Sequence, residues 1–364
     1  MAGQEDRNGG GGSLSRRVTM TDIARAAGCS QATVSVVLNN AAGVKISATT
    51  KSRVIEAALA LGYAAPQFVH EPVALKVRPK LSGTIGFLVD QLATSPEAVV
   101  AIEGLRQACW EDGRVVLVAQ TMSDSEMEEK TVRTLLAHGV DALVYMTIFT
   151  RRVSLPSFIR DANLPVVLLN CYTEAADLPS VVPAEVEGGH DATAHLIAQG
   201  HKRIAMITGE PWMEAARDRL KGYRRALIDA GLSFDPHIVL QGNWSPSAGY
   251  ECTRKLLSLK QRPTAIFCQN DRMAIGCYEA LKEAGLRIPE DMSVVGYDDE
   301  EISRHLMPQL TTVILPHRMM GHWAAEQLSP HANWHNGAPP QKRMECGLTR
   351  RASVAGVPGQ AQQT

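Results

Sequence analysis

Residues 18–39, VTMTDIARAAGCSQATVSVVLN, constrain the fold of this chain more than any other stretch. Thr19 and Asp22 form a Thr-x-x-Asp capping box, a pattern that predicts a helix over residues 20–27. Gly28 follows that helix. Because glycine has no Cβ, it suits the left-handed residue at which a helix ends. We therefore expect a short helix followed by a tight turn.

A second short helix is expected directly after the turn, over residues 31–38, with Ser30 as its cap. Its inward positions are apolar, whereas its outward positions are mostly small or polar: Gln31, Ala32, Thr33, Ser35 and Val36. A helix, a glycine turn and a second helix are typical of the motif that places its second helix in the DNA major groove. The alternative is an ordinary helical hairpin. A third expected helix, capped by Ser47 and ended by Gly62, favours a small DNA-binding domain over that alternative.

The same stretch, together with the later ALGY, resembles the headpiece of the lactose/galactose-repressor family of transcription regulators. The resemblance places Gln31, Ala32 and Val36 against base edges. The expected DNA-binding set also holds Thr19 and four residues that are better placed for phosphates: Ser30, Thr33, Ser35 and Asn39. Many relatives carry arginine where this chain has Val36, so the usual central bases of the operator are not implied.

One such headpiece covers half of a DNA site. The resemblance therefore implies a homodimer on a pseudopalindromic stretch of double-stranded operator DNA. The C-terminal residues, RRASVAGVPGQAQQT, hold no leucine heptads, so the tetramerising tail of some relatives is not expected.

The chain of 364 residues has room for a headpiece plus one large or two medium domains. Residues 1–82 carry ten Lys or Arg against five Asp or Glu, a net charge of +5, so the remainder carries −6 of the total −1. A basic head on an acidic body fits phosphate contact at one end. The seven scattered cysteines are expected to be reduced. No apolar run approaches membrane-spanning length and no signal-peptide core is present, so we expect a cytoplasmic protein without a membrane partner.

A proline-containing stretch, AAPQFVHEPVALKVRPKLS, follows the headpiece at residues 64–82. Its three prolines and basic end predict a hinge linker. In the resembled family this linker forms a short helix whose leucine opens the DNA minor groove, which implies Leu75 as the wedge. The linker is longer than is usual in the family, and Pro72 would break a helix beyond its first turn. A plain spacer is therefore the alternative.

From residue 83 the sequence alternates apolar, β-branched runs with helical stretches, which predicts parallel sheets covered by helices. The runs cover too many residues for one compact sheet, so we expect two similar lobes. GHKRIAMITG, RLKGY, NDRMAIG, SVVGYDD and LTTV resemble the periplasmic-binding-protein-like core of the same family. The expected fold class is α/β, with a three-helix helix-turn-helix headpiece and a two-lobed core of doubly wound parallel sheets.

This organisation divides the chain into a disordered tail at 1–17, the headpiece at 18–63, the linker at 64–82, the ligand-binding and dimerisation core at 83–355 and a tail at 356–364. Within the core, the N-lobe is expected at about 83–184 and 316–343, and the C-lobe at about 185–315 and 344–355.

Open parallel sheets bind ligands beyond the carboxyl ends of their strands. Residues that follow the apolar runs, read together with the family comparison, give the expected ligand-binding set: Asp90, Asn170, Arg217, Trp244, Asn270, Asp271 and Asp298. Carboxylates and amides accept hydroxyl groups, and an aromatic plane covers the C–H face of a sugar. Arg217 is expected to supply bidentate donors, and Asp271 to act behind the contact residues or as a cap. The alternative is that these Asp and Asn residues are ordinary turn residues or helix caps.

The sequence shows no phosphate loop, nucleophile elbow or His-Glu-x-x-His, so we expect neither an enzyme nor a cofactor. Four histidines, His317, His322, His331 and His335, match no zinc spacing, and no metal is expected. We expect a DNA-binding regulator, by default a repressor, whose operator affinity is controlled by a small effector, by default a sugar. The alternatives are a purine or phosphorylated effector in the same fold, a sugar-binding protein without a regulatory role, and an α/β enzyme.

Overall fold

The computed structural model describes residues 18–38, 46–61, 83–93, 96–329, 332 and 337–357. The chain separates into two compact units, Met1–Arg78 and Pro79–Thr364. Asn39, Leu75 and the linker expected at 64–82 lie outside the described residues. Among the residues that are described, we find no helix with the length and apolar character needed to span a membrane.

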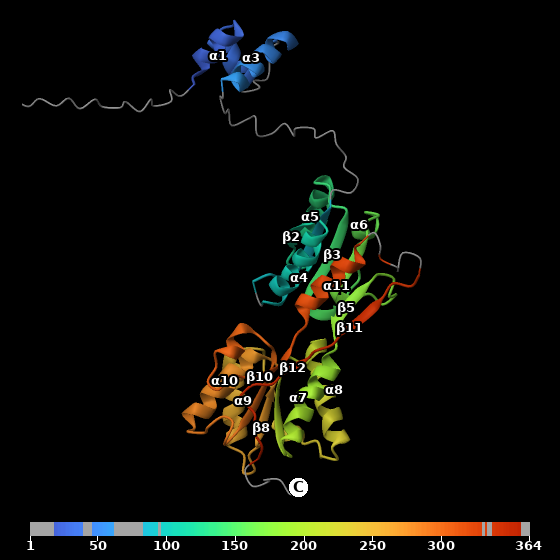
Figure 1. Cartoon of the computed structure of the whole chain (residues 1–364), viewed down its shortest axis with the longest axis vertical. Helices are drawn as coiled ribbons and strands as arrows, with labels where there is room; N and C mark the ends of the chain where they lie inside the picture. The colour runs from blue at the N-terminus through green and yellow to red at the C-terminus, as the bar shows by residue number, and fades with distance from the viewer. Residues whose placement is uncertain are drawn as a thin grey trace, which may run out of the picture. The chain divides into compact units, whose positions relative to one another are not determined.

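The first unit holds three helices in its described part: α1 (Met20–Ala27), α2 (Gln31–Leu38) and α3 (Ala48–Ala60) (Figure 1). At the start of α1, the Asp22 N–H donates to Thr19 Oγ1 (3.4 Å) and the Thr19 N–H donates to the Asp22 carboxylate (3.0 Å). Gly28 ends α1 with a φ of 62°. The helices bury one apolar core between them: Ile23, Ala24, Ala27, Val34, Leu38, Val54 and Ala58.

The second unit contains two lobes, each built on a six-stranded sheet. The N-lobe sheet is parallel throughout, in the order β11-β5-β4-β3-β1-β2. Its strands are β1 (Thr84–Val89), β2 (Val115–Gln120), β3 (Ala142–Arg152), β4 (Val166–Tyr172), β5 (Ser180–Pro183) and β11 (Gln341–Met344). One face is covered by α4 (Glu97–Glu111) and α11 (His317–Gln327), and the other by α5 (Ser125–Ala137) and α6 (Ser157–Arg160).

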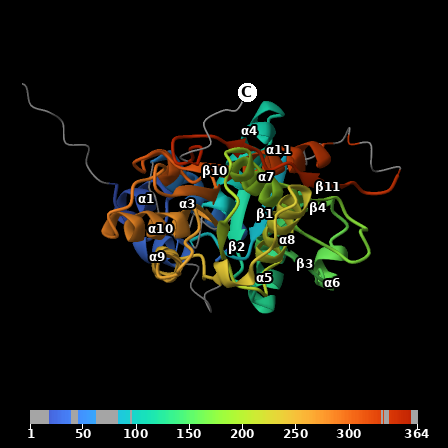
Figure 2. The same cartoon turned by 90° about the horizontal axis from the view of Figure 1, so that it is seen from below.

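The C-lobe sheet has the order β12-β10-β9-β8-β6-β7 and is parallel except where β10 meets β12. Its strands are β6 (Ile204–Thr208), β7 (Val239–Gln241), β8 (Ala265–Cys268), β9 (Ser293–Asp298), β10 (Thr311–Ile314) and β12 (Leu348–Thr349). Two helix pairs cover it: α7 (Glu185–Ala198) with α8 (Glu214–Asp229), and α9 (Pro246–Leu257) with α10 (Asp271–Glu283). Figures 1 and 2 show each pair side by side. Short 3-10 turns lie at Pro236–Ile238 and Glu301–Arg304.

Central strands of both sheets are buried almost along their whole length, because helices cover both faces of each sheet. Within the described residues the chain passes between the lobes three times: after β5, after β10 and after β11. These passages bring the carboxyl ends of strands from both sheets toward one another. The expected fold class, α/β with a helix-turn-helix headpiece and a two-lobed parallel core, is confirmed.

Candidate functional site

The headpiece presents one face of α2 to its surroundings. Gln31 and Ala32 are exposed, whereas Val34 and Leu38 are buried against the other two helices. The remaining expected contacts of this helix, Thr33, Ser35 and Val36, are half-buried. The second helix of the motif therefore carries an accessible surface of small and polar groups, which a helix entering the major groove requires.

Two of the expected DNA-binding residues also hold helix ends in place. Thr19 caps α1, as described above, and Ser30 caps α2 by accepting a hydrogen bond from the Thr33 N–H at 3.1 Å. Each side chain lies beside the N-terminus of a helix, where N–H groups favour an anion such as a phosphate. The capping role of Thr19 and Ser30 is shown by these hydrogen bonds, and the DNA contact expected of both residues stays a prediction.

A cavity of about 210 Å³ lies between the two lobes of the second unit. Its wall is formed by residues of both lobes: Glu97, Ile148, Phe149, Thr150, Asn170, Glu185, Met213, Ala215, Arg219, Trp244, Asn270, Arg272, Asp298, Glu300, Leu315 and His317. The cavity lies at the carboxyl ends of the strands, where a parallel sheet is expected to bind its ligand.

Four of the seven expected ligand-binding residues line this cavity: Asn170, Trp244, Asn270 and Asp298. Three of them have a positive φ, namely 58° at Asn170, 67° at Trp244 and 108° at Asp298. Residues other than glycine rarely adopt this conformation, and such strain concentrates at functional sites. The Trp244 ring lies so close to Gly209 that a Cβ there would be 1.8 Å from a ring carbon, so glycine is required beneath it.

The side-chain amides of Asn170 and Asn270 hold the backbone of the cavity wall in place. Asn170 Nδ2 donates to the carbonyl oxygens of Thr147 (2.9 Å) and Ile148 (3.0 Å). Asn270 caps α10 and donates to the Trp244 carbonyl oxygen (3.0 Å). Both amides hold backbone segments in position, whereas the side-chain polar atoms of Trp244 and Asp298 are not bonded to the backbone of the described residues.

The other three expected residues do not line the cavity, and for Asp271 a place behind the contact residues or at a cap was already expected. The Asp90 carboxylate is buried and accepts from the Ile148 N–H at 2.8 Å, so it anchors β3. Arg217 is exposed, and its guanidinium donates to the carbonyl oxygen of Pro211 at 3.1 Å. Asp271 is fully buried behind the wall.

The Asp271 carboxylate accepts from the Thr312 hydroxyl (2.6 Å) and from the Glu300 N–H (2.9 Å). It therefore supports the loop that carries Glu300 into the cavity. Burial raises the pKa of Asp271 to about 7. Its role is to hold the wall from behind.

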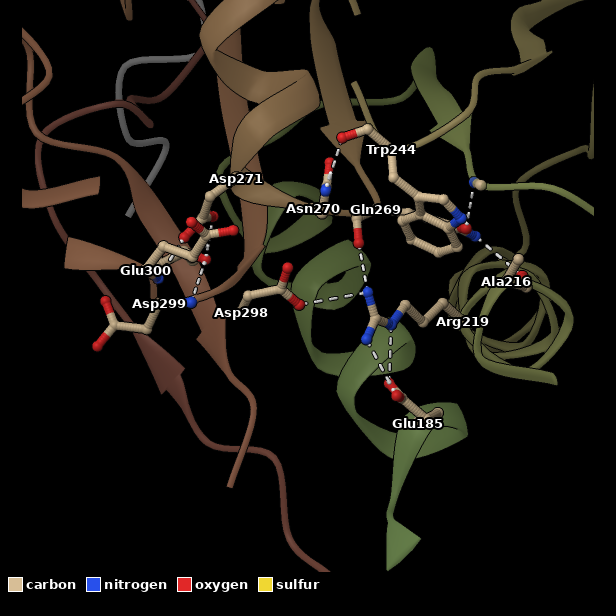
Figure 3. Close-up of polar contacts among 12 residues, drawn as sticks. Glu185, Ala216, Arg219, Trp244, Gln269, Asn270, Asp271, Asp298, Asp299 and Glu300 are labelled. Carbon is tan, nitrogen blue, oxygen red and sulfur yellow. Dashed lines mark hydrogen bonds and ion pairs between the residues drawn. The ribbon is translucent and has the colours of Figure 1, made fainter. Parts of the chain in front are cut away.

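Arg219, and not the expected Arg217, brings a guanidinium group to the cavity wall. Its guanidinium forms a two-pronged ion pair with Glu185, at 2.8 and 3.0 Å, and lies 3.5 Å from Asp298 (Figure 3). It also donates to the Gln269 carbonyl oxygen. Burial alone would lower the pKa of Arg219, but the adjoining carboxylates more than offset this, so its pKa is raised and it stays charged.

Several buried polar atoms of the cavity wall have no hydrogen-bond partner. These atoms are Glu97 Oε2, Trp244 Nε1 and both ring nitrogens of His317. An unpartnered buried polar group costs free energy, because it loses its hydrogen bonds to water without replacing them. Their convergence on one cavity indicates a ligand that supplies the missing partners.

Two carboxylates of the wall, Asp298 and Glu300, have raised pKa values. Burial raises the pKa of Asp298 well above its ordinary range, and Glu97 and Glu300 add to this, although Arg219 opposes it. The pKa of Glu300 is raised by burial in the same way. The cavity is therefore a site where negative charge is unfavourable until a donor or a cation arrives.

Comparisons with known proteins identify the family. Residues 19–66 match the family model for bacterial regulatory proteins of the lacI family, and residues 193–354 match that of a periplasmic binding protein-like domain. The HTH-type transcriptional repressor PurR of Aliivibrio fischeri (strain MJ11) is 34% identical over 312 residues, which cover 85% of this chain and 90% of that protein. The chain belongs to the LacI family.

Solved structures of LacI-family regulators share its fold. A transcriptional regulator of the family from Rhizobium etli matches with a TM-score of 0.70 and 32% identity, over 75% of this chain and 99% of that one. The complex of the transcriptional regulator CelR with cellobiose matches with a TM-score of 0.64 and 29% identity, over 93% of this chain and 100% of that one. The expectation of a DNA-binding transcriptional regulator is confirmed, and its family members are regulators rather than enzymes.

Sequence reasoning missed several wall residues of this LacI-family regulator: Glu97, Phe149, Thr150, Glu185, Arg219, Arg272, Glu300 and His317. For Arg219 a signal existed. It lies three residues after Ala216 and four before Tyr223, both buried on α8, whereas Arg217 lies on another face of that helix. For Glu97 and His317 the sequence offers no such signal, because each reaches the cavity only through the packing of the lobes. Of the other three histidines singled out, His322 is half-buried on α11, and 331 and 335 lie outside the described residues.

Proposed function

We propose that this LacI-family regulator is a cytoplasmic repressor that binds a pseudopalindromic operator as a homodimer, and that a hydroxyl-rich effector of the sugar class binds between its lobes and relieves repression. The observation that carries the proposal is the cavity wall, in which a tryptophan ring, several carboxylates and unpartnered buried polar atoms meet. From the expected set we retain Trp244 and Asp298 as effector contacts, and we add Arg219 in place of Arg217.

The chemistry of the wall favours a sugar over an anion. Asp298 and Glu300 accept hydrogen bonds from hydroxyl groups, and the Trp244 ring offers an apolar plane for the C–H face of a sugar. Both guanidinium groups of the wall, Arg219 and Arg272, are already paired with carboxylates. A phosphorylated effector would meet mostly acceptors of its own charge and is disfavoured. A related regulator, CelR, was solved with cellobiose.

A purine base is the second candidate. Two aromatic side chains, Phe149 and Trp244, line the cavity, and a flat ring stacks on such groups as well as a sugar does. A purine edge offers N–H donors to Asp298 and acceptors to the Trp244 Nε1. Binding measurements, rather than the geometry of the cavity, distinguish a sugar effector from a purine effector.

An effector in this cavity contacts both lobes at once. The lobes also touch each other beside it: the Tyr172 hydroxyl donates to the Glu214 carboxylate at 3.1 Å, and Phe149 meets Trp212 edge to face at 5.8 Å. Ligand binding that favours one arrangement of the lobes shifts the population toward it. Coupling between two sites is typically ~1–3 kcal/mol, and linkage requires that DNA change effector affinity by the same factor.

The N-lobe offers a surface for the second subunit. β2 is an edge strand of its sheet, and Val115 and Val118 on it are 54% and 42% exposed. Trp110, at the end of the neighbouring α4, is 71% exposed. An exposed apolar edge of this kind favours pairing with another chain, which supports the proposed homodimer.

The test is a thermal-shift screen of the full chain with sugars, sugar acids and purines, followed by operator binding with the compounds that respond. We expect one sugar to raise the unfolding midpoint and to weaken operator binding. Trp244→Ala should lose the response, whereas Arg217→Ala, an exposed change outside the cavity, should keep it. A response to purines alone would replace the sugar with the second candidate. An unchanged operator affinity at saturating effector would refute the coupling.

A further inference from the structure

Three carboxylates from both lobes converge inside the cavity. One oxygen each of Glu97, Asp298 and Glu300 lies within 4.8 Å of the other two. Glu97 is the first residue of α4 in the N-lobe, whereas Asp298 ends β9 and Glu300 follows it in the C-lobe. Like charges this close repel each other strongly once water is excluded, so the cluster opposes the approach of the lobes unless positive charge enters.

The wall of the cavity carries an excess of negative charge. Its lining residues, all of them described, include four carboxylates and two guanidinium groups, a formal charge of −2. The guanidinium groups are paired with carboxylates other than Glu97, at 2.8 Å for Arg219 and 2.9 Å for Arg272. Glu97 thus has no cationic partner among these lining residues, and its Oε2 is buried without a hydrogen bond.

A second, independent group in the same wall also awaits a donor. His317 is 2% exposed, begins α11 and has no hydrogen-bond partner at either ring nitrogen. Burial and the nearby Arg219 lower its pKa to about 3, so the ring is neutral at physiological pH and one nitrogen is an acceptor. Among the unsatisfied atoms of the wall, Glu97 Oε2 and one ring nitrogen of His317 are acceptors, and they line a cavity with surplus negative charge.

We propose that the effector carries a protonated primary amine, so that it is an amino sugar rather than a neutral sugar, and that its ammonium group bridges Glu97 of the N-lobe to Asp298 and Glu300 of the C-lobe. The inference rests on the proposed sugar-class effector. An ammonium group has three N–H donors and no acceptor, which matches a cluster of three carboxylates. Its charge replaces repulsion between the lobes by attraction, so the amine drives the closure that the hydroxyl groups and the Trp244 ring then stabilise.

The test compares matched sugars on the full chain. D-Glucosamine, D-galactosamine and D-mannosamine are each titrated beside the parent sugar and the N-acetyl derivative, which keeps the substituent but removes its charge. We expect one amino sugar to bind at least about tenfold more tightly than both of its uncharged counterparts, as a charge-assisted hydrogen bond predicts. Glu97→Gln should erase this preference. Glu103→Gln, a change on the same helix at a half-buried residue outside the cavity wall, should leave it intact, and each variant is compared with its own ligand-free midpoint.

Each other outcome has a defined meaning. Parent or N-acetyl sugars that bind as tightly as amino sugars overturn the amine and leave the sugar-class effector standing. Mg²⁺, Ca²⁺ or Mn²⁺ that stabilises the protein through Glu97, while amino sugars have no effect, assigns the cluster to a metal and also overturns the amine. A panel in which no sugar of either kind binds refutes the sugar class together with this inference. An amino-sugar preference that survives Glu97→Gln refutes the bridging role of that carboxylate.

Discussion

The buried His317 predicts that the free energy of unfolding of the second unit falls at acid pH. Burial and Arg219 lower the pKa of its ring from 6.5 to about 3. The unfolded chain therefore takes up a proton at this residue near pH 6.5, whereas the folded chain does so only near pH 3. Because the unfolded state binds more protons between these values, the free energy of unfolding falls as the pH falls through this interval.

The magnitude follows from the two pKa values. One pKa unit corresponds to ~1.4 kcal/mol. At pH 5 the unfolded ring is protonated and the folded ring is still neutral, so this residue lowers the free energy of unfolding by ~2 kcal/mol relative to pH 8. A change of this size is a large part of the net stability of a typical domain.

The perturbation is His317→Leu, which replaces the ring with an apolar side chain of similar size and removes the titration. Urea unfolding of the full chain is followed by tryptophan fluorescence at pH 8, 6.5 and 5. All five tryptophans lie after residue 78, so the signal reports the second unit rather than the headpiece. The loss of stability between pH 8 and pH 5 should be ~2 kcal/mol smaller in the variant than in the natural chain.

The control is His322→Leu, a change at a half-buried residue of the same helix outside the cavity wall, whose pH profile should parallel that of the natural chain. Titration of other groups cancels in the comparison, because it is common to all three proteins. Parallel profiles for His317→Leu and the natural chain would show that the ring is hydrated or paired in solution, and the reasoning about the unpartnered nitrogens would fail with it.

Three further changes test the packing of the core, each by urea unfolding. Burial raises the pKa of Asp271 to about 7, so the free energy of unfolding of the natural chain falls as the pH rises from about 4 through 7. Asp271→Asn should remove that fall. An unchanged dependence of the free energy of unfolding on pH would contradict this prediction. Arg219→Met leaves buried carboxylates unpaired and should cost ~3–5 kcal/mol, whereas a neutral effect would mean that the pair is hydrated. Gly104→Ala places a Cβ 2.0 Å from the Arg318 carbonyl oxygen and should cost ~1–3 kcal/mol by forcing α4 from α11; full stability would show that this contact is loose.

The headpiece is the part of this protein that its sequence determined most completely. The predicted bounds of α1 and α2 agree with the structure because their signals are local: a capping box, a serine cap and a glycine C-cap act over three or four residues. The alternation of apolar runs and helical stretches likewise predicted the parallel sheets. Strand β11, QKRM, was not predicted, because it is a mostly exposed edge strand without an apolar pattern.

Tertiary structure decided which polar residues meet in the cavity. Asp90 follows a strand as Asp298 ends one, yet their places differ. The Asp90 carboxylate is buried within the N-lobe on the Ile148 N–H, whereas Asp298 lines the cavity between the lobes. Glu97 and His317 come from the N-lobe, and they join Asp298 only through the three passages of the chain between the lobes. Local pattern fixes helices and strands because their signals span a few residues. Contacts between residues more than two hundred positions apart depend on how whole sheets pack, which no local pattern encodes.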